Sequence, residues 1–303
     1  MRAAALSDCP VCASPAFAPL HEAEDKWMRV PGHFQYARCL GCDQVYLRRR
    51  PAPEDMGRYY PPGYIRVGRA PARVRRFFRR RDLAGRVALV AAQPGSRVLD
   101  VGCATGEFLD AVRDTGRTVA GVEPTDWAAE AAAARGIPVW HATLAEAELP
   151  EGAFDVATLW DVVEHLDAPA DDLARVRQAL RPGGRLVVAT PVLDGWEARR
   201  FGEHWPGWDT PRHLTVFSHA TLDALLARAG FRVVERVWIY ESYLVTALAL
   251  TLLSGDRLPR RVAGAVGWLL HIRPVRLAAA PLFRWLDRRF ESCAVTVVAE
   301  RVG

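Results

Sequence analysis

Lysine is almost absent from this chain of 303 residues, because Lys26 is the only one. The net charge of +5 therefore rests on arginine, and such a bias reflects coding composition more than function. No uncharged apolar run reaches the ~18 residues that a membrane-spanning helix needs, and the N-terminus lacks the apolar core of a signal peptide. We therefore expect a cytoplasmic protein with one large domain and a small appendage.

Cysteines are few, but four of the six lie in two C-x-x-C pairs. Two residues between the cysteines let both thiolates of one turn face the same ion, and two such turns complete a closed tetrahedral site. Free cysteines in this spacing favour a reducing compartment and a metal over disulfides. Structural zinc is thus predicted, with reactive dithiols as the alternative; the ligands would be Cys9, Cys12, Cys39 and Cys42.

Residues 97–109 predict a strand, a tight turn and the start of a helix. The apolar part ends in Asp100, and Gly102 and Gly106 follow. Glycine adopts positive φ freely and lets the backbone approach a ligand closely. The unpaired N–H groups of the new helix attract a polar or anionic group. These features are typical of a ligand-binding turn.

A second short strand, residues 118–123, ends in Glu123. In a doubly wound sheet, an acidic residue at this point lies beside the first turn and can accept hydrogen bonds from both hydroxyls of a ribose. A nucleoside-containing cofactor is therefore predicted. The alternative is that Asp100 caps the next helix and that Glu123 is a solvated strand end.

The order Asp100, Gly102, Ala104, Gly106 resembles the first motif of the class I S-adenosylmethionine-dependent methyltransferases, D-x-G-x-G-x-G. Ala104 departs from the middle glycine by one methyl group. A dinucleotide site would instead need G-x-G-x-x-G. The resemblance implies that Asp100 and the loop hold the methionine end of S-adenosylmethionine, and that Glu123 holds the ribose.

The order of motifs further along the chain resembles the small-molecule branch of the same family. A strand at 154–160 is followed by E-H-L, a helix, L-R-P-G-G and another strand at 185–190. We predict an α/β fold with a doubly wound, seven-stranded, mostly parallel Rossmann-like sheet. Thr143 stands where the family usually has an acidic residue near the adenine amino group. The predicted cofactor-binding residues are Asp100, Gly102, Ala104, Gly106, Phe108, Glu123, Thr143, Leu144 and Trp160.

The sequence divides into four predicted parts: a zinc-ribbon-like head (1–50), a linker with a basic helix (51–94), the cofactor-binding domain (95–240 and 291–303) and a helical insert (241–290). The linker is rich in proline and tyrosine, and its arginine-rich helix lies around 73–81. This helix presents either a solvated basic face or a surface that attracts phosphates.

Asp161, Glu164 and His165 form an acidic and imidazole cluster after the fourth strand. On a helical turn these positions share a face, so their side chains could converge. The pattern is similar to the E-x-x-E-H cluster of ubiquinone-pathway O-methyltransferases, which implies a divalent ion or an acid/base role for His165. The alternative is that the cluster only shapes the wall of the cofactor pocket.

The segment 204–214 is rich in tryptophan, histidine and charge. A methyl acceptor that carries a proton needs a base of near-neutral pKa, which histidine provides. We predict His213 as that base, with His204 as second choice and Arg212 as an anchor for an anion. A similar W…PRHL…F segment recurs in zinc-ribbon-headed methyltransferases. The alternative is a loop that is held in place by its own tryptophans.

The insert at 241–290 contains three apolar stretches flanked by arginines such as Arg257, Arg260 and Arg261. Stretches of this length are too short to span a bilayer and too apolar for an ordinary loop. The pattern predicts either a helical cap over the acceptor pocket or an interfacial foot on the inner face of a membrane.

The predicted function is methyl transfer from S-adenosylmethionine to a small-molecule or lipid-linked acceptor, such as a glycan intermediate, a quinone-like compound or a natural-product precursor. The zinc head and the basic charge favour an alternative, a methyltransferase of ribosomal or transfer RNA. Nucleic acid ranks lower because no N-P-P-Y-type amine site and no Pro-Cys nucleophile follows the fourth strand. A non-enzymatic adaptor that binds the cofactor is the third hypothesis.

Overall fold

The computed structural model divides the chain into two compact units. The arginine-rich helix predicted around 73–81 lies outside the described residues, which are 3–60, 83–90, 95–238 and 242–303. The first unit comprises residues 1–67, 191–221 and 240–295, and the second comprises residues 68–190, 222–239 and 296–303.

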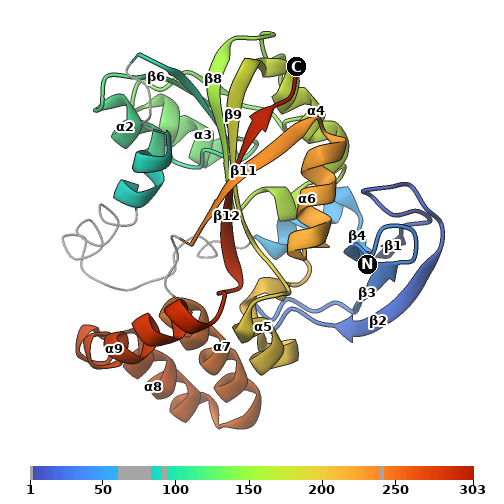
Figure 1. Ribbon diagram of the computed structural model, residues 1–303. Coiled ribbons are helices and arrows are strands. Elements are labelled where there is room, and N and C mark those ends of the chain that lie inside the picture. Colours follow the sequence, from blue (N-terminus) through green and yellow to red (C-terminus); the bar gives the residue numbers. More distant parts are fainter. Residues whose placement is uncertain (1–2, 61–82, 91–94, 239–241) are drawn as a thin grey trace. The chain divides into compact units, whose positions relative to one another are not determined.

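The second unit is built on a seven-stranded sheet with the strand order β11-β12-β9-β8-β5-β6-β7. The pairs β5–β6, β5–β8, β6–β7 and β8–β9 are parallel, and β11 pairs with β12 antiparallel. This confirms the predicted Rossmann-like sheet (Figure 1). The strands are β5 (Arg97–Val101), β6 (Thr118–Val122), β7 (Val139–Trp140), β8 (Phe154–Trp160), β9 (Leu180–Pro191), β11 (Phe231–Val237) and β12 (Ala294–Arg301).

Helices flank this sheet and bury its central strands. Val98 and Leu99 of β5 and Leu159 of β8 are fully buried, as expected of parallel strands covered on both faces. From β5 the chain runs outward to β6 and β7 and then returns to the other side of β5 as β8. This reversal is a topological switch point, where ligands bind beside the carboxyl ends of the strands. The helices are α2 (Glu107–Arg113), α3 (Asp126–Ala133), α4 (Pro169–Ala179) and α6 (His219–Arg228) (Figure 1).

The first unit contains a small antiparallel sheet with the order β1-β4-β3-β2. A segment from the middle of the chain joins it, because β10 pairs with β4 and the Leu47 N–H donates to the Leu214 carbonyl at 2.8 Å. The strands are β1 (Ala3–Ala5), β2 (Phe17–Ala23), β3 (Phe34–Cys39), β4 (Val45–Pro51) and β10 (Thr215–Val216), and a 3₁₀ helix, η1 (Pro53–Tyr59), follows β4.

One apolar core connects the small sheet with the later segments of the same unit. Phe34 and Tyr36 of β3 pack in one cluster with Trp205 and Cys293. The buried Trp205 indole N–H donates to Cys293 Sγ at 2.9 Å, so Cys293 is part of this packing. The short helices after β9 are α5 (Trp196–Phe201), η3 (Gly202–His204) and η4 (Pro206–Trp208).

The insert forms three helices, α7 (Ser242–Arg257), α8 (Arg260–His271) and α9 (Arg273–Arg289). Helix α7 contacts α8, α9 and the short helices after β9, and α8 also contacts α9. Among the described residues, no helix is both long and apolar enough to cross a membrane.

Candidate functional site

Asp100 lies near the carboxyl end of β5 with 3% of its surface exposed. Its Oδ1 accepts a hydrogen bond of 2.5 Å from the Thr158 hydroxyl on the neighbouring strand β8. Burial and, to a smaller extent, the nearby Glu123 raise the pKa of Asp100 to about 7, although the Thr158 hydrogen bond and Arg86 offset part of this rise. The carboxyl group therefore titrates near neutral pH, where a cationic ligand would favour its charged form.

The loop after β5 alternates in backbone conformation. Gly102, Ala104 and Gly106 have φ values of +71°, +47° and +74°. A Cβ on Gly102 would lie 2.6 Å from Val162 Cγ2, and one on Gly106 would lie 2.5 Å from Ile137 Cδ1. Both glycines are therefore required by conformation and by space. Ala104 adopts the left-handed conformation at a steric cost, which explains why the family motif has glycine there.

Glu123 follows β6 directly and is 7% exposed. One carboxylate oxygen accepts the Ala104 N–H and the other accepts the Thr125 N–H, each at 2.9 Å. Glu123 thereby fixes the middle of the loop that follows β5. A carboxylate has about four acceptor positions, so two remain available for donors such as ribose hydroxyls.

Trp160 ends β8 at the same edge of the sheet. Its ring meets Phe108 in an edge-to-face contact with centroids 5.4 Å apart, and the Arg86 guanidinium lies 4.8 Å above it. The indole N–H of Trp160 is buried and has no hydrogen-bond partner among the described residues. A buried donor without a partner is costly, and a bound polar group would satisfy it. No motif in the sequence indicated Arg86, whose guanidinium places a positive charge beside Trp160.

Thr143 and Leu144 form a tight turn after β7. The Thr143 N–H and hydroxyl both donate to Glu146, at 3.1 and 2.7 Å, and Leu144 is buried. These hydrogen bonds hold the pKa of Glu146 below its ordinary value. Glu146 is thus an exposed carboxylate that closes this turn, and the roles of Thr143 and Leu144 in cofactor binding stay predictions.

Of the predicted cluster of Asp161, Glu164 and His165, the last two lie together, because a ligand atom of Glu164 and one of His165 are within 4.8 Å of one another. Among the described residues, Asp161 does not join them with metal-ligand spacing. The reason is local: Asp161 has a φ of +57° and only residues 163–165 form a 3₁₀ turn, so the spacing of an α-helix does not apply. Glu164 is buried and accepts a 2.9 Å hydrogen bond from Thr190. The predicted convergence of all three side chains is therefore wrong, and a divalent ion at this place stays a prediction.

Arg212 belongs to the first unit and is fully buried. Its guanidinium donates to both carboxylate oxygens of Asp25, to Asp209 and to the carbonyls of Tyr59 and Thr210. All five N–H groups are used, so none remains for an acceptor. The prediction that Arg212 anchors an anion is wrong, because the residue organises its own loop.

The two histidines of this loop differ in their surroundings. Nδ1 of His213 lies 2.8 Å from the Gly207 carbonyl, so Nδ1 carries the proton of that hydrogen bond, and Nε2 lies 4.0 Å from an Asp209 carboxylate oxygen. Nε2 of His204 is instead 3.1 Å from Asp256 and 3.5 Å from Lys26. Both histidines belong to the first unit, and His165 belongs to the second. Their catalytic roles stay predictions.

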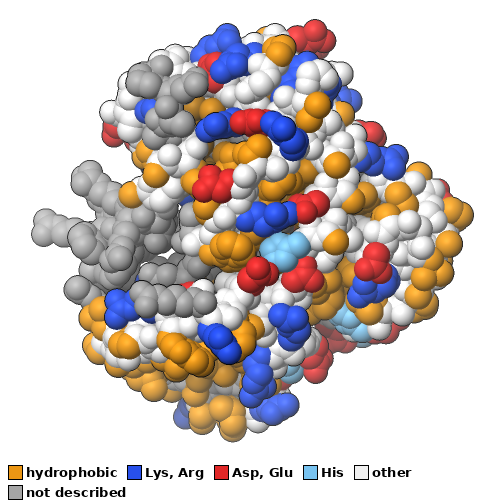
Figure 2. Space-filling model, in the orientation of Figure 1, with side chains coloured by type: hydrophobic (Ala, Val, Ile, Leu, Met, Phe, Trp, Pro, Cys, Tyr) orange, Lys and Arg blue, Asp and Glu red, His pale blue; other side chains and the backbone are white. Residues whose placement is uncertain are grey.

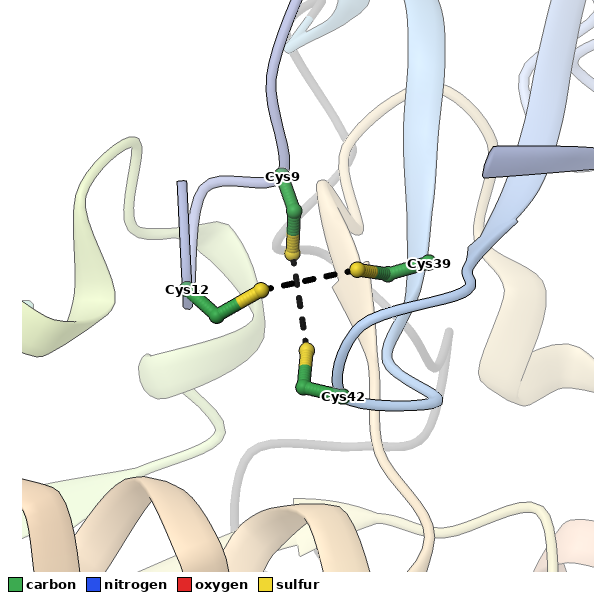
Figure 3. Close-up of side chains that lie close together, drawn as sticks. All are labelled: Cys9, Cys12, Cys39 and Cys42. Carbon is green, nitrogen blue, oxygen red and sulfur yellow. Dashed lines mark hydrogen bonds between the residues drawn. The ribbon is translucent and has the colours of Figure 1, made fainter. Parts of the chain in front are cut away.

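The four cysteines of the head point toward a common centre (Figure 3). Sγ of Cys9 lies 3.7 Å from that of Cys42, and Sγ of Cys12 lies 3.5 Å from that of Cys39. A tetrahedral zinc ion with bonds of about 2.3 Å would hold its sulfurs about 3.8 Å apart. The donor set and the spacing therefore fit zinc.

The two turns that carry these cysteines have the same backbone design. The residues after the second cysteine of each pair, Ala13 and Asp43, have φ values of +60° and +63°. In one turn the Gly41 N–H also donates to Cys39 Sγ at 3.3 Å. Two matching turns that face one another are what a closed four-cysteine site requires.

The parallel sheet, the left-handed glycine loop and the acidic residues at the carboxyl ends of β5 and β6 define a class I methyltransferase fold. Residues 74–236, more than half of the chain, match the methyltransferase domain family, and the chain belongs to that family. A solved structure with the same fold is a putative sarcosine dimethylglycine methyltransferase from Galdieria sulphuraria, with a TM-score of 0.51 and 14% identity, covering 74% of this chain and 86% of that one. This likeness concerns the fold alone.

Two curated relatives are similar to the central part of the chain. A probable S-adenosylmethionine-dependent methyltransferase from Mycolicibacterium smegmatis is 32% identical over 151 residues, which is 48% of this chain and 56% of that protein. A tRNA U34 carboxymethyltransferase from Azotobacter vinelandii is 34% identical over 152 residues, 45% of this chain and 46% of that protein. The chain thus spans about half the length of these relatives.

Proposed function

We propose that this protein transfers a methyl group from S-adenosylmethionine to a small-molecule or lipid-linked acceptor. The observation that carries the proposal is the pair of buried carboxyl groups, Asp100 and Glu123, on either side of a left-handed glycine loop. When bound, the cofactor supplies a methyl group on a sulfonium, and methyl transfer needs no further activation of that group.

The residues around the loop fit this cofactor. Asp100 and the loop would hold the cationic methionine end, and Glu123 would accept the ribose hydroxyls through its two remaining acceptor positions. The rings of Phe108 and Trp160 and the turn at Thr143 and Leu144 would line the rest of the site. The unpaired indole N–H of Trp160 supports a polar ligand here.

His213 is the proposed base for an acceptor that carries a proton, and His204 and His165 are weaker candidates. The Gly207 carbonyl orients the His213 ring, and Nε2, which lies 4.0 Å from an Asp209 carboxylate oxygen, would take the proton. Replacing His213 with Asn should lower kcat and flatten the acid limb of its pH profile, with cofactor affinity retained. The same change at the exposed His271 is the matched control. Equal kcat in both variants would remove His213 from the mechanism.

The head is proposed to hold one structural zinc ion. Four sulfurs fill a tetrahedral shell and leave no open position for a substrate, so the ion would stabilise the head and take no part in the reaction.

A second candidate is methylation of transfer or ribosomal RNA. One group of relatives is named for a reaction on tRNA U34, and the cysteine-rich head fits a nucleic-acid partner as well as a protein one. The relatives therefore do not support the prediction that nucleic acid is the less favoured acceptor, and the test includes both kinds of acceptor.

The test uses methyl-labelled cofactor with separate RNA, lipid and small-molecule extracts. We expect label in the lipid or small-molecule fraction, and none with Glu123→Gln, whereas the exposed Glu130→Gln on α3 should retain transfer. Label in RNA alone would replace the first candidate with the second. Binding of cofactor without transfer to any fraction would contradict both and favour the adaptor hypothesis.

A further inference from the structure

Helices α8 and α9 expose large apolar side chains. Both helices contact α7 and each other, and residues such as Ala263 are buried in those contacts. The ring of Tyr243 on α7 also meets Phe283 on α9, with centroids 5.1 Å apart. The inward sides of the two helices are thus already packed. The outward apolar surface, here the α8–α9 face, comprises Val262 (47% exposed), Trp268 (67%), Leu269 (48%), Leu277 (59%), Leu282 (56%) and Trp285 (57%).

Arginines accompany these apolar side chains. Arg261 lies on the exposed side of α8, and Arg284 and Arg289 lie on the exposed side of α9. These three arginines make no ion pair in the part of the chain that the structure describes. Figure 2 shows hydrophobic and arginine side chains together over the lower part of one face, where Figure 1 places α8 and α9. The charge on the α8–α9 face is therefore positive, and the exposed carboxylate of α9, Asp287, is not among the residues of this face.

We propose that the α8–α9 face docks on the surface of an anionic membrane. Val262 and Leu269 of α8 lie seven positions apart, and Leu282 and Trp285 of α9 lie three positions apart, so each helix gathers these apolar residues on one side, as do helices that lie flat in the interface. Tryptophan prefers the depth of the headgroups, and arginine extends from there to lipid phosphates. The contact would hold the protein beside a lipid-linked acceptor. Because docking itself needs no cofactor, it can fail or succeed independently of the proposed reaction.

Positive charge favours a membrane over a second copy of this chain as the occupant. Two copies that met through this face would bring unpaired arginines together without carboxylates to neutralise them. An anionic leaflet instead attracts each arginine by a free energy equivalent to about a fivefold change in partitioning. Charge complementarity therefore selects the lipid surface.

Flotation of the full-length protein with vesicles tests the proposal. We expect binding to phosphatidylglycerol-containing vesicles, little binding to pure phosphatidylcholine, and release at high salt. The triple variant Arg261→Gln, Arg284→Gln, Arg289→Gln should lower partitioning by about a hundredfold. The double variant Trp268→Ser, Trp285→Ser should lower it by about tenfold or more.

Matched variants outside the α8–α9 face show whether the loss of vesicle binding depends on this face or on net charge and surface tryptophan in general. Replacing Arg58, Arg199 and Arg232 with Gln removes the same charge from other exposed positions, and Trp127→Ser removes a tryptophan that is 51% exposed on α3. These controls should retain binding. Wild-type protein that stays unbound at low salt would overturn the proposal. So would equal loss in the controls, binding of RNA in place of vesicles, or a dimer in light scattering that Trp268→Ser, Trp285→Ser dissociates.

Discussion

The guanidinium of Arg212 and the carboxylate of Asp25 form a two-pronged ion pair although the residues are 187 positions apart. The two N···O distances are 2.7 and 3.0 Å, and neither side chain is exposed. Asp25 also accepts the N–H groups of Trp27 and Met28, so one buried carboxylate fixes the turn after β2 and the loop that precedes β10. The opposing charges lower the cost of burying both groups.

Removing one partner of this pair should strongly destabilise the first unit. We expect Arg212→Ala to lower the free energy of unfolding by about 3–5 kcal/mol, because the Asp25 carboxylate is left buried without its counter-ion. Arg212→Lys should recover only part of the loss, since an ammonium cannot make parallel bonds to both oxygens. Urea unfolding followed by tryptophan fluorescence measures the change.

The exposed pair of Arg49 and Glu22, with a distance of 2.8 Å, is the control for this prediction. Arg49→Ala should cost less than about 1 kcal/mol, because solvent screens an exposed pair. If Arg49→Ala and Arg212→Ala lowered the free energy of unfolding by the same amount, burial would not increase the contribution of the Arg212 pair to stability.

The sheet of the second unit was predictable because its determinants are local. Apolar runs end in Asp100 and Glu123, glycine marks the turn, and Pro169 opens α4 at its first position. Each of these signals lies within one strand or one turn. The four cysteines were predictable for the same reason, since each pair is a single turn.

The wrong predictions concern residues whose partners are far away in sequence or whose backbone is irregular. Arg212 is engaged by Asp25, which no spacing rule connects with it. Asp161 has positive φ, which a helical spacing cannot anticipate. The pairing of β10 with β4 likewise depends on tertiary contacts such as Thr215 with Tyr46.

Zinc should be present at one ion per chain, and the head should depend on it. Cys39→Ser is expected to abolish zinc in elemental analysis and to lower the melting temperature, because three sulfurs cannot close the shell. Cys103→Ser is the control, since Cys103 packs beside Gly121 in the second unit, whereas the four-cysteine cluster belongs to the first unit. A protein that is free of zinc and melts at the same temperature as Cys39→Ser would contradict the assignment.

Cofactor affinity should rise with pH across the range centred on about 7. Burial raises the pKa of Asp100 to about 7, above the ordinary value of 3.8. Between these two pH values, Asp100 is therefore protonated in the folded protein and ionised in the unfolded chain. The stability that Asp100 contributes is therefore complete below about 4 and is lost as the pH rises through about 7. A bound sulfonium and ammonium favour the ionised form and release that proton.

Calorimetry in two buffers of different ionisation enthalpy measures this proton release. Wild-type protein should release protons on binding below pH 7, and Asp100→Asn should bind more weakly, by about tenfold or more, with no such release. Asp114→Asn, an exposed change at the end of α2, should behave as wild type. Equal proton release in wild type and Asp100→Asn would assign the titration to another group.

Replacing Ala104 with glycine should stabilise the second unit and preserve its site. The φ of +47° at Ala104 is unfavourable for a residue with a Cβ and free of cost for glycine. The gain should be about 0.5–1 kcal/mol after the greater freedom of glycine in the unfolded chain is subtracted. Cofactor affinity should not fall, because the N–H that Glu123 accepts is retained. Ala131→Gly, at a half-buried interior position of α3, should instead lose about 1 kcal/mol. Urea unfolding of both variants gives the two changes, and a loss of stability in Ala104→Gly as large as that in Ala131→Gly would show that the left-handed turn is not the conformation of this loop in solution.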